Sequence, residues 1–503
     1  MNQQDLSFDA PDYYADGTFH RAHYRFHGNE TEGWHIFRDG TLIETLGPGY
    51  EVVDVERCGV CSTDLARRFL PYPLPQVIGH EVTGLREGRR VVVEINASHA
   101  ARNRGTAHCP FCREGLSTHC PDRITLGINR LPGGFAPWLL APTQAIIPVS
   151  ETIPSLAAAL TEPFAAALQG VEATWPKSGD RVAVLGPRRL GMLLLAALRG
   201  FRTRQNLDFH ITALARHDAL LALSSRMGAD DTVDLRTHSS ASLANSFDIV
   251  FDTTGKPEGF ETALKLARRV VHLKSTNGMP VLGLRHLTDL VVDELALLPG
   301  NYHHLGFTWP VERDVDAPRA NHNVFVSPSV PDHILEEEMT QTARTGGQRV
   351  FHRLTFEHAL QRLKNQPEDG HLFPKDSPVP RFDLALVTNL AEADRVIRPI
   401  PDEEFSLVRP RGAILLVDPG ARERDPSPLA HAIWERGIQV HSSRCGDFRR
   451  ALAIMENQPE LTNIMVEEMI THQFDLEDIE DAFSVASDSS RSIKVVVNAP
   501  ESS

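Results

Sequence analysis

Residues 179–196 read GDRVAVLGPRRLGMLLLA and join a short apolar run to a second, helix-like run through a glycine turn. The first run, 181–185, has the length of a buried strand, and the apolar residues after Gly186 have helical spacing. Two later segments are also apolar, strand-like runs that end in polar residues: FDIVFDTTG at 247–255 and RVVHLKST at 269–276. Apolar strands that alternate with helices predict a parallel α/β sheet.

The first 170 residues have a different texture. They are rich in Gly, Pro and His, and their strand-like runs are short: YEVVDVE (50–56), RRVVVEI (89–95) and WLLAPTQAIIPV (138–149). This pattern is typical of an irregular β-rich domain. Near the other end, the segment from Asp475 predicts a helix with an acidic start and then a final strand.

Two distant segments resemble each other. In both 247–276 and 382–420, a strand after Phe-Asp is followed by a helical stretch, a basic turn and a second strand. Either a partial duplication extended the sheet, or two α/β units only look alike. The stretch 296–380 between them is rich in Pro, His and Asn and is too long for a bare loop. We predict an inserted subdomain or lid there, and its role cannot be read from the sequence.

The bulk properties exclude several classes of protein. A chain of 503 residues is too long for one core, so two or three domains are expected. A net charge of -15 disfavours a nucleic-acid or anionic-membrane partner, because both require a basic face. No apolar run is long enough to span a bilayer, and the first residues lack the features of a signal peptide. A cytoplasmic protein is therefore expected.

Five of the six cysteines lie between Cys58 and Cys120, and clustered thiols in such a chain indicate metal ligands before disulfides. Catalytic zinc requires three protein ligands and one open position. Cys61 and His80 fit two of these roles, and Glu162 supplies a carboxylate for the third. Cys58 is expected to be a small buried side chain without a redox role.

Several motifs, in this order, resemble the zinc-dependent medium-chain dehydrogenase (alcohol dehydrogenase-like) family. They are CGVCSTDL (58–65), VIGHEVTG (77–84), HCPFCREGLSTHC (108–120), TEPFAAALQGVE (161–172) and the glycine turn quoted above. The closest branch contains the threonine and polyol dehydrogenases, and the resemblance covers most of 45–280 and 430–500.

The resemblance implies an α/β fold with two domains and a large insertion. A GroES-like β-rich catalytic domain is expected at 1–170 and 466–503. A Rossmann-type doubly wound parallel sheet that binds the nucleotide is expected at 171–295 and 381–465, and the insertion occupies 296–380.

The resemblance also implies roles for individual residues. Cys61, His80 and Glu162 match the ligands of the catalytic zinc. Glu81 matches a nearby carboxylate that can move onto the metal, and Thr63 matches the hydroxyl that begins a proton relay to solvent. Zinc lowers the pKa of a bound alcohol, as it does that of bound water, so that hydride can leave for the nicotinamide.

A second group of thiols matches the family's structural zinc lobe only in part. Cys109, Cys112 and Cys120 occupy three of its four positions, and Thr106 stands where the first cysteine is expected. His108 is a substitute, although neighbouring residues rarely both reach one tetrahedral ion. A zinc-bearing lobe and a zinc-free lobe with buried thiols both remain open.

The nucleotide motif is altered as well. A dinucleotide site requires glycines between the strand and the helix so that the backbone can approach the pyrophosphate. Here the turn contains Gly186, Arg188, Leu190 and Gly191, and Arg188 replaces the middle glycine. Its cation either contacts the phosphates or obstructs them.

The end of the second strand selects the cofactor. An NAD site usually has a carboxylate there, whereas this chain has Ala215 followed by Arg216, which favours the 2′-phosphate of NADP over NAD. Thr254 and Ser275 match positions that face the nicotinamide in the family. Cys445 matches a recurring family tetrad, and a structural role is expected for it.

These observations predict a zinc-dependent oxidoreductase that transfers hydride between a small secondary alcohol and NADP or NAD. The alternative is a catalytically weak or inactive scaffold of the same fold that binds a ligand or partner. A zinc-free reductase of activated alkenes is disfavoured by Cys61 and His80. Family members commonly pair through the edge strands of the nucleotide domain, so a homo-oligomer is expected unless the 382–420 unit covers or replaces that edge.

Overall fold

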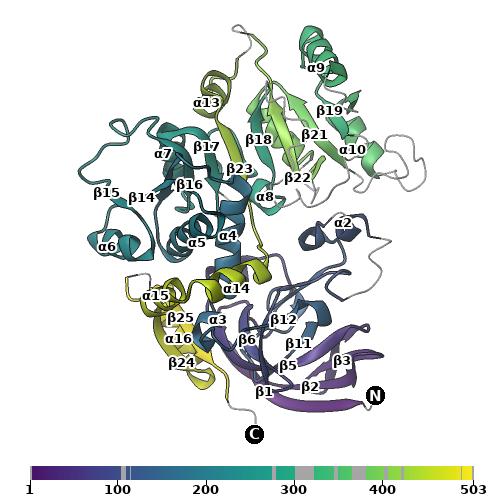
Figure 1. Ribbon diagram of the computed structural model, residues 1–503. Helices are drawn as coiled ribbons and strands as arrows, with labels where there is room; N and C mark the ends of the chain where they lie inside the picture. Colours follow the sequence, from purple (N-terminus) through teal and green to yellow (C-terminus); the bar gives the residue numbers. More distant parts are fainter. Residues whose placement is uncertain are drawn as a thin grey trace. The chain divides into compact units, whose positions relative to one another are not determined.

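The computed structural model divides the chain into two compact units (Figure 1). The first contains Met1–Ala166 and Cys445–Ser503, and the second contains Ala167–Arg444. The structure describes residues 3–102, 109–113, 115–274, 279–300, 322–344, 349–364, 381–400, 406–420, 424–488 and 490–500. Thr106, His108, Ser275 and much of 296–380 lie outside these ranges. In the described ranges, no helix combines the length and apolar character that crossing a membrane requires.

The first unit is built from three β-sheets. An antiparallel meander contains β1 (Gln4–Tyr13), β2 (Phe19–Asn29), β3 (Gly33–Arg38) and β4 (Thr41–Leu46). A seven-stranded sheet has the order β12 (Ile146–Pro148), β7 (Arg89–Val93), β6 (Glu81–Arg86), β5 (Tyr50–Gly59), β25 (Lys494–Asn498) and β24 (Ile470–Asp475), with β11 (Trp138–Pro142) also on β5. A small sheet joins β10 (Arg130–Leu131), β9 (Ile124–Leu126) and β8 (Asn96–Ala97).

Short helices surround these sheets: α1 (Ser62–Leu65), α2 (Pro110–Arg113), α3 (Ser155–Ala158), α14 (Phe448–Asn457), α15 (Pro459–Met469) and α16 (Ile479–Ser487). The boundary between the units lies within α4 (Thr161–Thr174) and again at Arg444/Cys445. The sequence-based boundaries were 170 and 466, so α14 and most of α15 lie with the first unit rather than the second.

The second unit is organised around an eleven-stranded sheet. Its first six strands in spatial order are β15 (Asp231–Asp234), β14 (His210–Ala215), β13 (Arg181–Leu185), β16 (Phe247–Asp252), β17 (Ala267–Leu273) and β23 (Gln439–Ser442). Neighbours in this group are parallel. Numbered in chain order, these strands have the 3-2-1-4-5-6 arrangement of dinucleotide-binding sheets, in which the order of the strands reverses between β13 and β16.

Five further strands continue the sheet: β18 (Ala296–Pro299), β22 (Val408–Leu416), β21 (Phe382–Val387), β19 (His322–Val326) and β20 (Arg349–Arg353). They are parallel to one another, and β18 pairs antiparallel with β23. An inserted subdomain or lid was expected at 296–380. Its described parts contribute β18, β19 and β20 to the central sheet instead.

Helices connect and cover these strands: α5 (Arg189–Gln205), α6 (Asp218–Met227), α7 (Pro257–Leu266), α8 (Leu287–Val292), α9 (Asp332–Arg344), α10 (Phe356–Lys364), α12 (Leu390–Ile397) and α13 (Pro428–Arg436). Their ends follow from local chemistry. Ser427 caps α13 by accepting a hydrogen bond from the Leu429 amide, and Pro428 occupies the first turn. Gly437 ends the helix in the left-handed conformation, with φ of 64°.

Candidate functional site

The predicted zinc ligands Cys61 and His80 lie at the ends of two adjacent strands. Cys61 follows β5 and caps the N-terminus of α1, and His80 directly precedes β6, which pairs with β5. Gly79 makes the turn before His80 with φ of 99°, and a Cβ there would lie 2.8 Å from Cys58 Sγ. Only glycine suits both the dihedral angle and the space.

Asp64 connects the two candidate ligands. Its Oδ2 accepts a hydrogen bond of 2.8 Å from the Cys61 amide, and its Oδ1 lies 3.2 Å from His80 Nδ1. The side chains of Asp64 and His80 are both buried. Burial lowers the pKa of His80, but the negative groups of Asp64 and Cys61 outweigh it and raise that pKa well above its usual range. The imidazole therefore sits in a negative environment that a cation would neutralise.

Lys494 is a buried cation beside the same group, and it was not identified from the sequence. It begins β25 and forms an ion pair with Glu81, and its Nζ donates a hydrogen bond of 3.1 Å to the Val60 carbonyl. Burial lowers the pKa of Lys494, but Glu81, Cys61 and Glu162 raise it on balance. The only signal in the sequence is a single lysine at the start of an otherwise apolar strand, KVVVN.

Glu162 and Thr63 complete the predicted set. Glu162 is half-buried in the first turn of α4, and its effect on the pKa of Lys494 places it in the same electrostatic neighbourhood. Thr63 is half-buried in α1, two residues after Cys61. The structure thus places Cys61, Thr63, His80 and Glu81 at or next to the ends of β5 and β6, and Glu162 at the start of α4 in the same unit.

The donor set fits a zinc ion. A thiolate, an imidazole and a carboxylate are the ligand types of catalytic zinc. Asp64 Oδ1 faces His80 Nδ1 at 3.2 Å, and Glu81 Oε2 is paired with Lys494. These contacts hold the imidazole and the second carboxylate in place beside Cys61, as the partners of metal ligands do.

The thiols of the lobe form a tighter group. The ligand atoms of Cys109, Cys112, Cys120 and His99 all lie within 4.8 Å of one another, and in the described part of the chain no other group of three or more such residues does so. Cys109 Sγ and Cys120 Sγ are 3.9 Å apart, and His99 Nδ1 is 3.4 Å from Cys120 Sγ. Two sulfurs bound at ~2.3 Å to a tetrahedral ion stand roughly 3.8 Å apart, which matches this spacing.

His99 is the fourth member that sequence reasoning missed. The family spacing pointed to Thr106 or His108, whereas His99 lies ten residues before Cys109, in the turn after β8. The Ser98 hydroxyl accepts a hydrogen bond from the Ala101 amide and fixes this turn. His99 Nε2 lies 3.4 Å from Asp122, as expected of a ligand whose second nitrogen is oriented by a carboxylate.

The glycine turn lies at the point where the strand order reverses. Gly186 follows β13 with φ of 75°, and a Cβ there would lie 2.6 Å from Thr254 Cγ2. The Thr253 hydroxyl donates to the Gly186 carbonyl at 2.9 Å, and a Cβ on Gly191 would meet the same hydroxyl oxygen at 2.7 Å. The turn is therefore held against the end of β16, where the backbone can approach a phosphate.

The other predicted nucleotide contacts line the carboxyl edge of the sheet. Arg188 is the exposed N-cap residue of α5, and Leu190 is half-buried in its first turn. Arg216 is exposed directly after β14, and Ala215 before it is buried. Ser275 lies outside the described residues.

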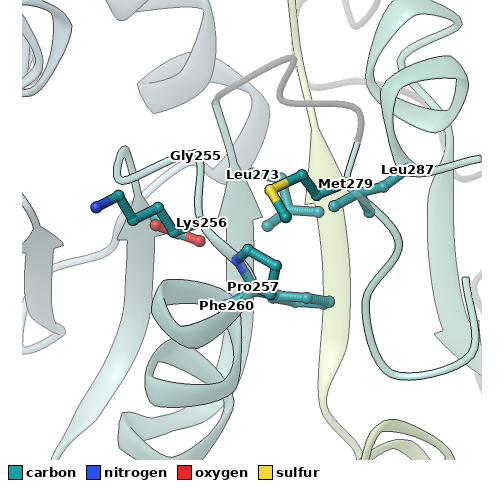
Figure 2. A pocket seen from close by; sticks show the side chains of 8 residues that line it. Gly255, Lys256, Pro257, Phe260, Leu273, Met279 and Leu287 are labelled. Carbon is teal, nitrogen blue, oxygen red and sulfur yellow. The ribbon is translucent and has the colours of Figure 1, made fainter. Parts of the chain in front are cut away.

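Thr254 and Asp252 define the next strand end. The Thr254 hydroxyl and amide donate to Asp252 Oδ1 at 2.6 and 2.9 Å. Burial raises the pKa of Asp252 despite these two bonds. A pocket opens beside them, between the ends of β16 and β17 (Figure 2). Its lining residues are Asp252, Gly255, Lys256, Pro257, Phe260, Leu273, Met279 and Leu287.

This pocket is apolar on most sides. Figure 2 shows Leu273, Met279 and Leu287 close together, with Phe260 below them and Lys256 directed away. The Gly186 turn and the pocket therefore flank the end of β16 on its two sides, in the direction in which an extended dinucleotide crosses such a sheet.

Comparison with known proteins identifies the relatives of this chain. Residues 47–151 match the alcohol dehydrogenase GroES-like domain. The L-threonine 3-dehydrogenase of Edwardsiella ictaluri is 26% identical over 254 residues, which are 46% of this chain and 70% of that enzyme. Other threonine dehydrogenases match over 66% of their own length.

Solved structures share the fold. L-idonate 5-dehydrogenase from Escherichia coli superposes with a TM-score of 0.56 at 14% identity, covering 99% of this chain and all (100%) of that one. A zinc-binding dehydrogenase from Sinorhizobium meliloti bound to NADP gives 0.51 at 18% identity, with coverage of 98% and 99%. The chain is thus similar in sequence to L-threonine 3-dehydrogenases and shares its fold with zinc-binding and polyol dehydrogenases. The predicted resemblance and the GroES-like and Rossmann-type fold are confirmed.

Proposed function

We propose that this protein is a zinc-dependent oxidoreductase that transfers hydride between a secondary alcohol and NADP or NAD. The observation that carries the proposal is the connection of Cys61 to the buried His80 through Asp64, with the Glu81–Lys494 pair beside them and Glu162 acting on the same lysine. The glycine turn at Gly186 supplies the second requirement, a place for the pyrophosphate.

Each residue of the group has a role in this reaction. Cys61, His80 and Glu162 would hold the zinc, which supplies Lewis-acid chemistry and lowers the pKa of the substrate hydroxyl. Thr63 takes the proton from that hydroxyl and passes it to solvent. Asp64 orients His80 through Nδ1, at 3.2 Å.

Lys494 positions Glu81 in the same scheme. The ion pair holds the Glu81 carboxylate beside the zinc ligands and balances one of their negative charges. In the reverse reaction, reduction of a ketone, Thr63 returns the proton to the product alkoxide.

For the cofactor, we favour NADP. The buried Ala215 offers no carboxylate to the ribose hydroxyls, and the exposed Arg216 beside it offers a cation to a 2′-phosphate. Replacement Arg216→Ala is expected to raise KM for NADP at least tenfold while leaving KM for NAD nearly unchanged. An equal effect on both cofactors would remove the support for NADP.

For the substrate, we propose a small polar secondary alcohol of the polyol, sugar or hydroxy-amino-acid type. The relatives named above act, by their names, on threonine and on idonate, and both carry hydroxyls next to polar groups. For the lobe, we propose that His99, Cys109, Cys112 and Cys120 hold a second, structural zinc.

The second candidate function is a scaffold of the same fold without activity, and the exposed Arg188 in place of a glycine favours it. Titration with NADPH and NADH, followed by nicotinamide fluorescence, separates the two. Binding of either cofactor, together with cofactor reduction on addition of threonine, idonate or a polyol, supports the enzyme. Failure of both cofactors to bind supports the scaffold.

A further inference from the structure

The second unit contains the same fold twice. We infer that these two copies have exchanged their last strands, so that one chain carries the interface of a two-fold dimer, and that only the first copy binds a dinucleotide. The nucleotide part of this inference rests on the proposed function. The first copy extends from β13 to β18, and the second extends from β19 to β23.

The elements of the two copies follow one another in the same order. The first has β13, α5, β14, α6, β16, α7, β17, α8 and β18, and the second has β19, α9, β20, α10, β21, α12, β22, α13 and β23. The strands also neighbour one another alike, β14-β13-β16-β17 in one copy and β20-β19-β21-β22 in the other. Among the described residues, β15 has no counterpart.

Residue contacts repeat with the elements. Asp248 follows Phe247 at the start of β16, and its carboxylate accepts a hydrogen bond of 2.8 Å from the Arg181 amide. Asp383 occupies the same place in β21 and accepts a hydrogen bond of 2.8 Å from the Asn323 amide. The register of each strand with its next neighbour shifts just after the phenylalanine, at Phe247/Ile249 and at Phe382/Leu384. Two units that only look alike would not share such details.

The last strand of each copy lies in the other copy's half of the sheet. β17 leads through α8 to β18, which pairs with β22, whereas β22 leads through α13 to β23, which pairs with β17 (Figure 1). Exchange of an identical element across a two-fold axis is the arrangement of a domain-swapped dimer.

The two exchanged strands meet at the axis. The ladders make Val270 of β17 and Ala413 of β22 equivalent, because they pair with Ile249 and Leu384. Val270 pairs with Gln439 and Ala413 pairs with Ala296, so Gln439 and Ala296 are equivalent, and so are the next residues, Val440 and Leu297. These last two residues pair with each other in the antiparallel contact of β18 with β23. A contact between equivalent residues is what a two-fold interface requires.

The nucleotide turn is present in the first copy alone. The ladders make Val182 and Val324 equivalent, because they pair with Ile249 and Leu384. Four residues further along, Pro328 lies opposite Gly186, and proline cannot adopt the positive φ of that glycine. Helix α5 has Arg189 in its first turn, whereas α9 has Asp332. An acidic residue at a helix N-terminus occupies the place where a phosphate would be favoured.

A carboxylate also occupies the strand ends of the second copy. Glu392 Oε2 accepts hydrogen bonds from the Thr388 amide at 3.1 Å and from the Ser329 hydroxyl at 2.8 Å. Thr388 corresponds to Thr253, which holds the glycine turn in the first copy. A group with the charge of a phosphate therefore already lies at the strand ends of the second copy.

The inference predicts a monomeric chain that binds one nucleotide. Each copy covers the edge strand that the other would expose, so the sheet needs no second chain at this place. Native mass spectrometry of the purified chain with excess NADPH is expected to show one 55.8 kDa chain with its bound zinc and one NADPH. A dimer of chains would overturn the internal interface, and two NADPH per chain would overturn the empty second copy.

Gly186→Val assigns the bound nucleotide to a copy. The valine would meet Thr254, so binding is expected to weaken at least hundredfold. Gly179→Ala is the matched control, because Gly179 has a similar φ of 88° with open space around it. Unchanged binding by Gly186→Val, with the melting temperature of the control, would place the nucleotide elsewhere and overturn the assignment. If the wild-type chain binds neither cofactor, the proposed function fails, and the mass alone still decides the internal interface.

Discussion

Two cysteines three residues apart, Cys58 and Cys61, lie in different environments in this fold. Cys58 is fully buried, and burial raises its pKa well above the usual thiol range, so it stays a neutral side chain of the core. Cys61 caps a helix beside His80. We expect Cys61→Ser to lose one of two zinc ions per chain and at least a thousandfold in kcat, whereas Cys58→Ser keeps both zinc ions. Plasma mass spectrometry of the purified variants measures the metal content, and equal zinc in the two variants would contradict the assignment.

The Glu81–Lys494 pair allows a second test with single residues. Both side chains are almost completely buried, and removing one partner leaves the other charge without compensation. Such a change costs about 3–5 kcal/mol, whereas replacing both partners costs much less. We therefore expect Lys494→Met to lower the free energy of unfolding more than the double variant Glu81→Gln/Lys494→Met. Denaturant unfolding of both measures this, and additive effects would show that the two residues are not coupled.

Single site residues could be predicted from the sequence where they belong to a motif with fixed spacing. Cys61, His80 and Glu162 were predicted because the surrounding motifs match a known order, and whether they bind zinc stays a prediction. Lys494 was missed because only the pairing of β25 with β5, over 400 residues apart in the chain, brings it to Glu81. His99 was missed because the fourth ligand was expected at Thr106 or His108, and His99 lies several residues earlier in the chain.

The lobe gives a prediction about a whole element. Its helix α2 is only four residues long, so a metal is expected to supply much of the stability of this helix and of the turn at His99. His99→Ala is expected to lose one zinc per chain without a change at Cys61, and His99→Cys is expected to keep it, because cysteine also ligates zinc. Metal content, together with the rate of proteolysis in the lobe, measures both effects. Full zinc content in His99→Ala would leave the lobe as a zinc-free group of thiols.

Strands of the second unit could be predicted from the sequence where they lie in the interior of the sheet. The Phe-Asp segments at β16 and β21 were visible because both strands are buried and apolar, and they suggested a duplication without deciding it. β20, RVFHR, was not recognised because it is the edge strand and is largely half-exposed, so its composition is mixed. The exchange of last strands has no signal in local sequence, since it depends on which strand each connection reaches.

The distribution of metal sites over the whole chain leads to the last prediction. All the residues that we assign to zinc lie in the unit of Met1–Ala166 and Cys445–Ser503, and the nucleotide turn lies in the other unit. Removal of zinc with a chelator should therefore destabilise one unit and spare the other. A ligand present at a thousandfold its Kd contributes about 4 kcal/mol, so two zinc ions contribute about 8 kcal/mol, which corresponds to a shift of roughly 16–32 °C for a unit of this size. Calorimetry is expected to show one transition that moves by this amount on chelation and another that moves only on addition of NADPH. If both transitions move together under chelation, the zinc sites stabilise the chain as a single cooperative unit, and the division of roles between the two units is wrong.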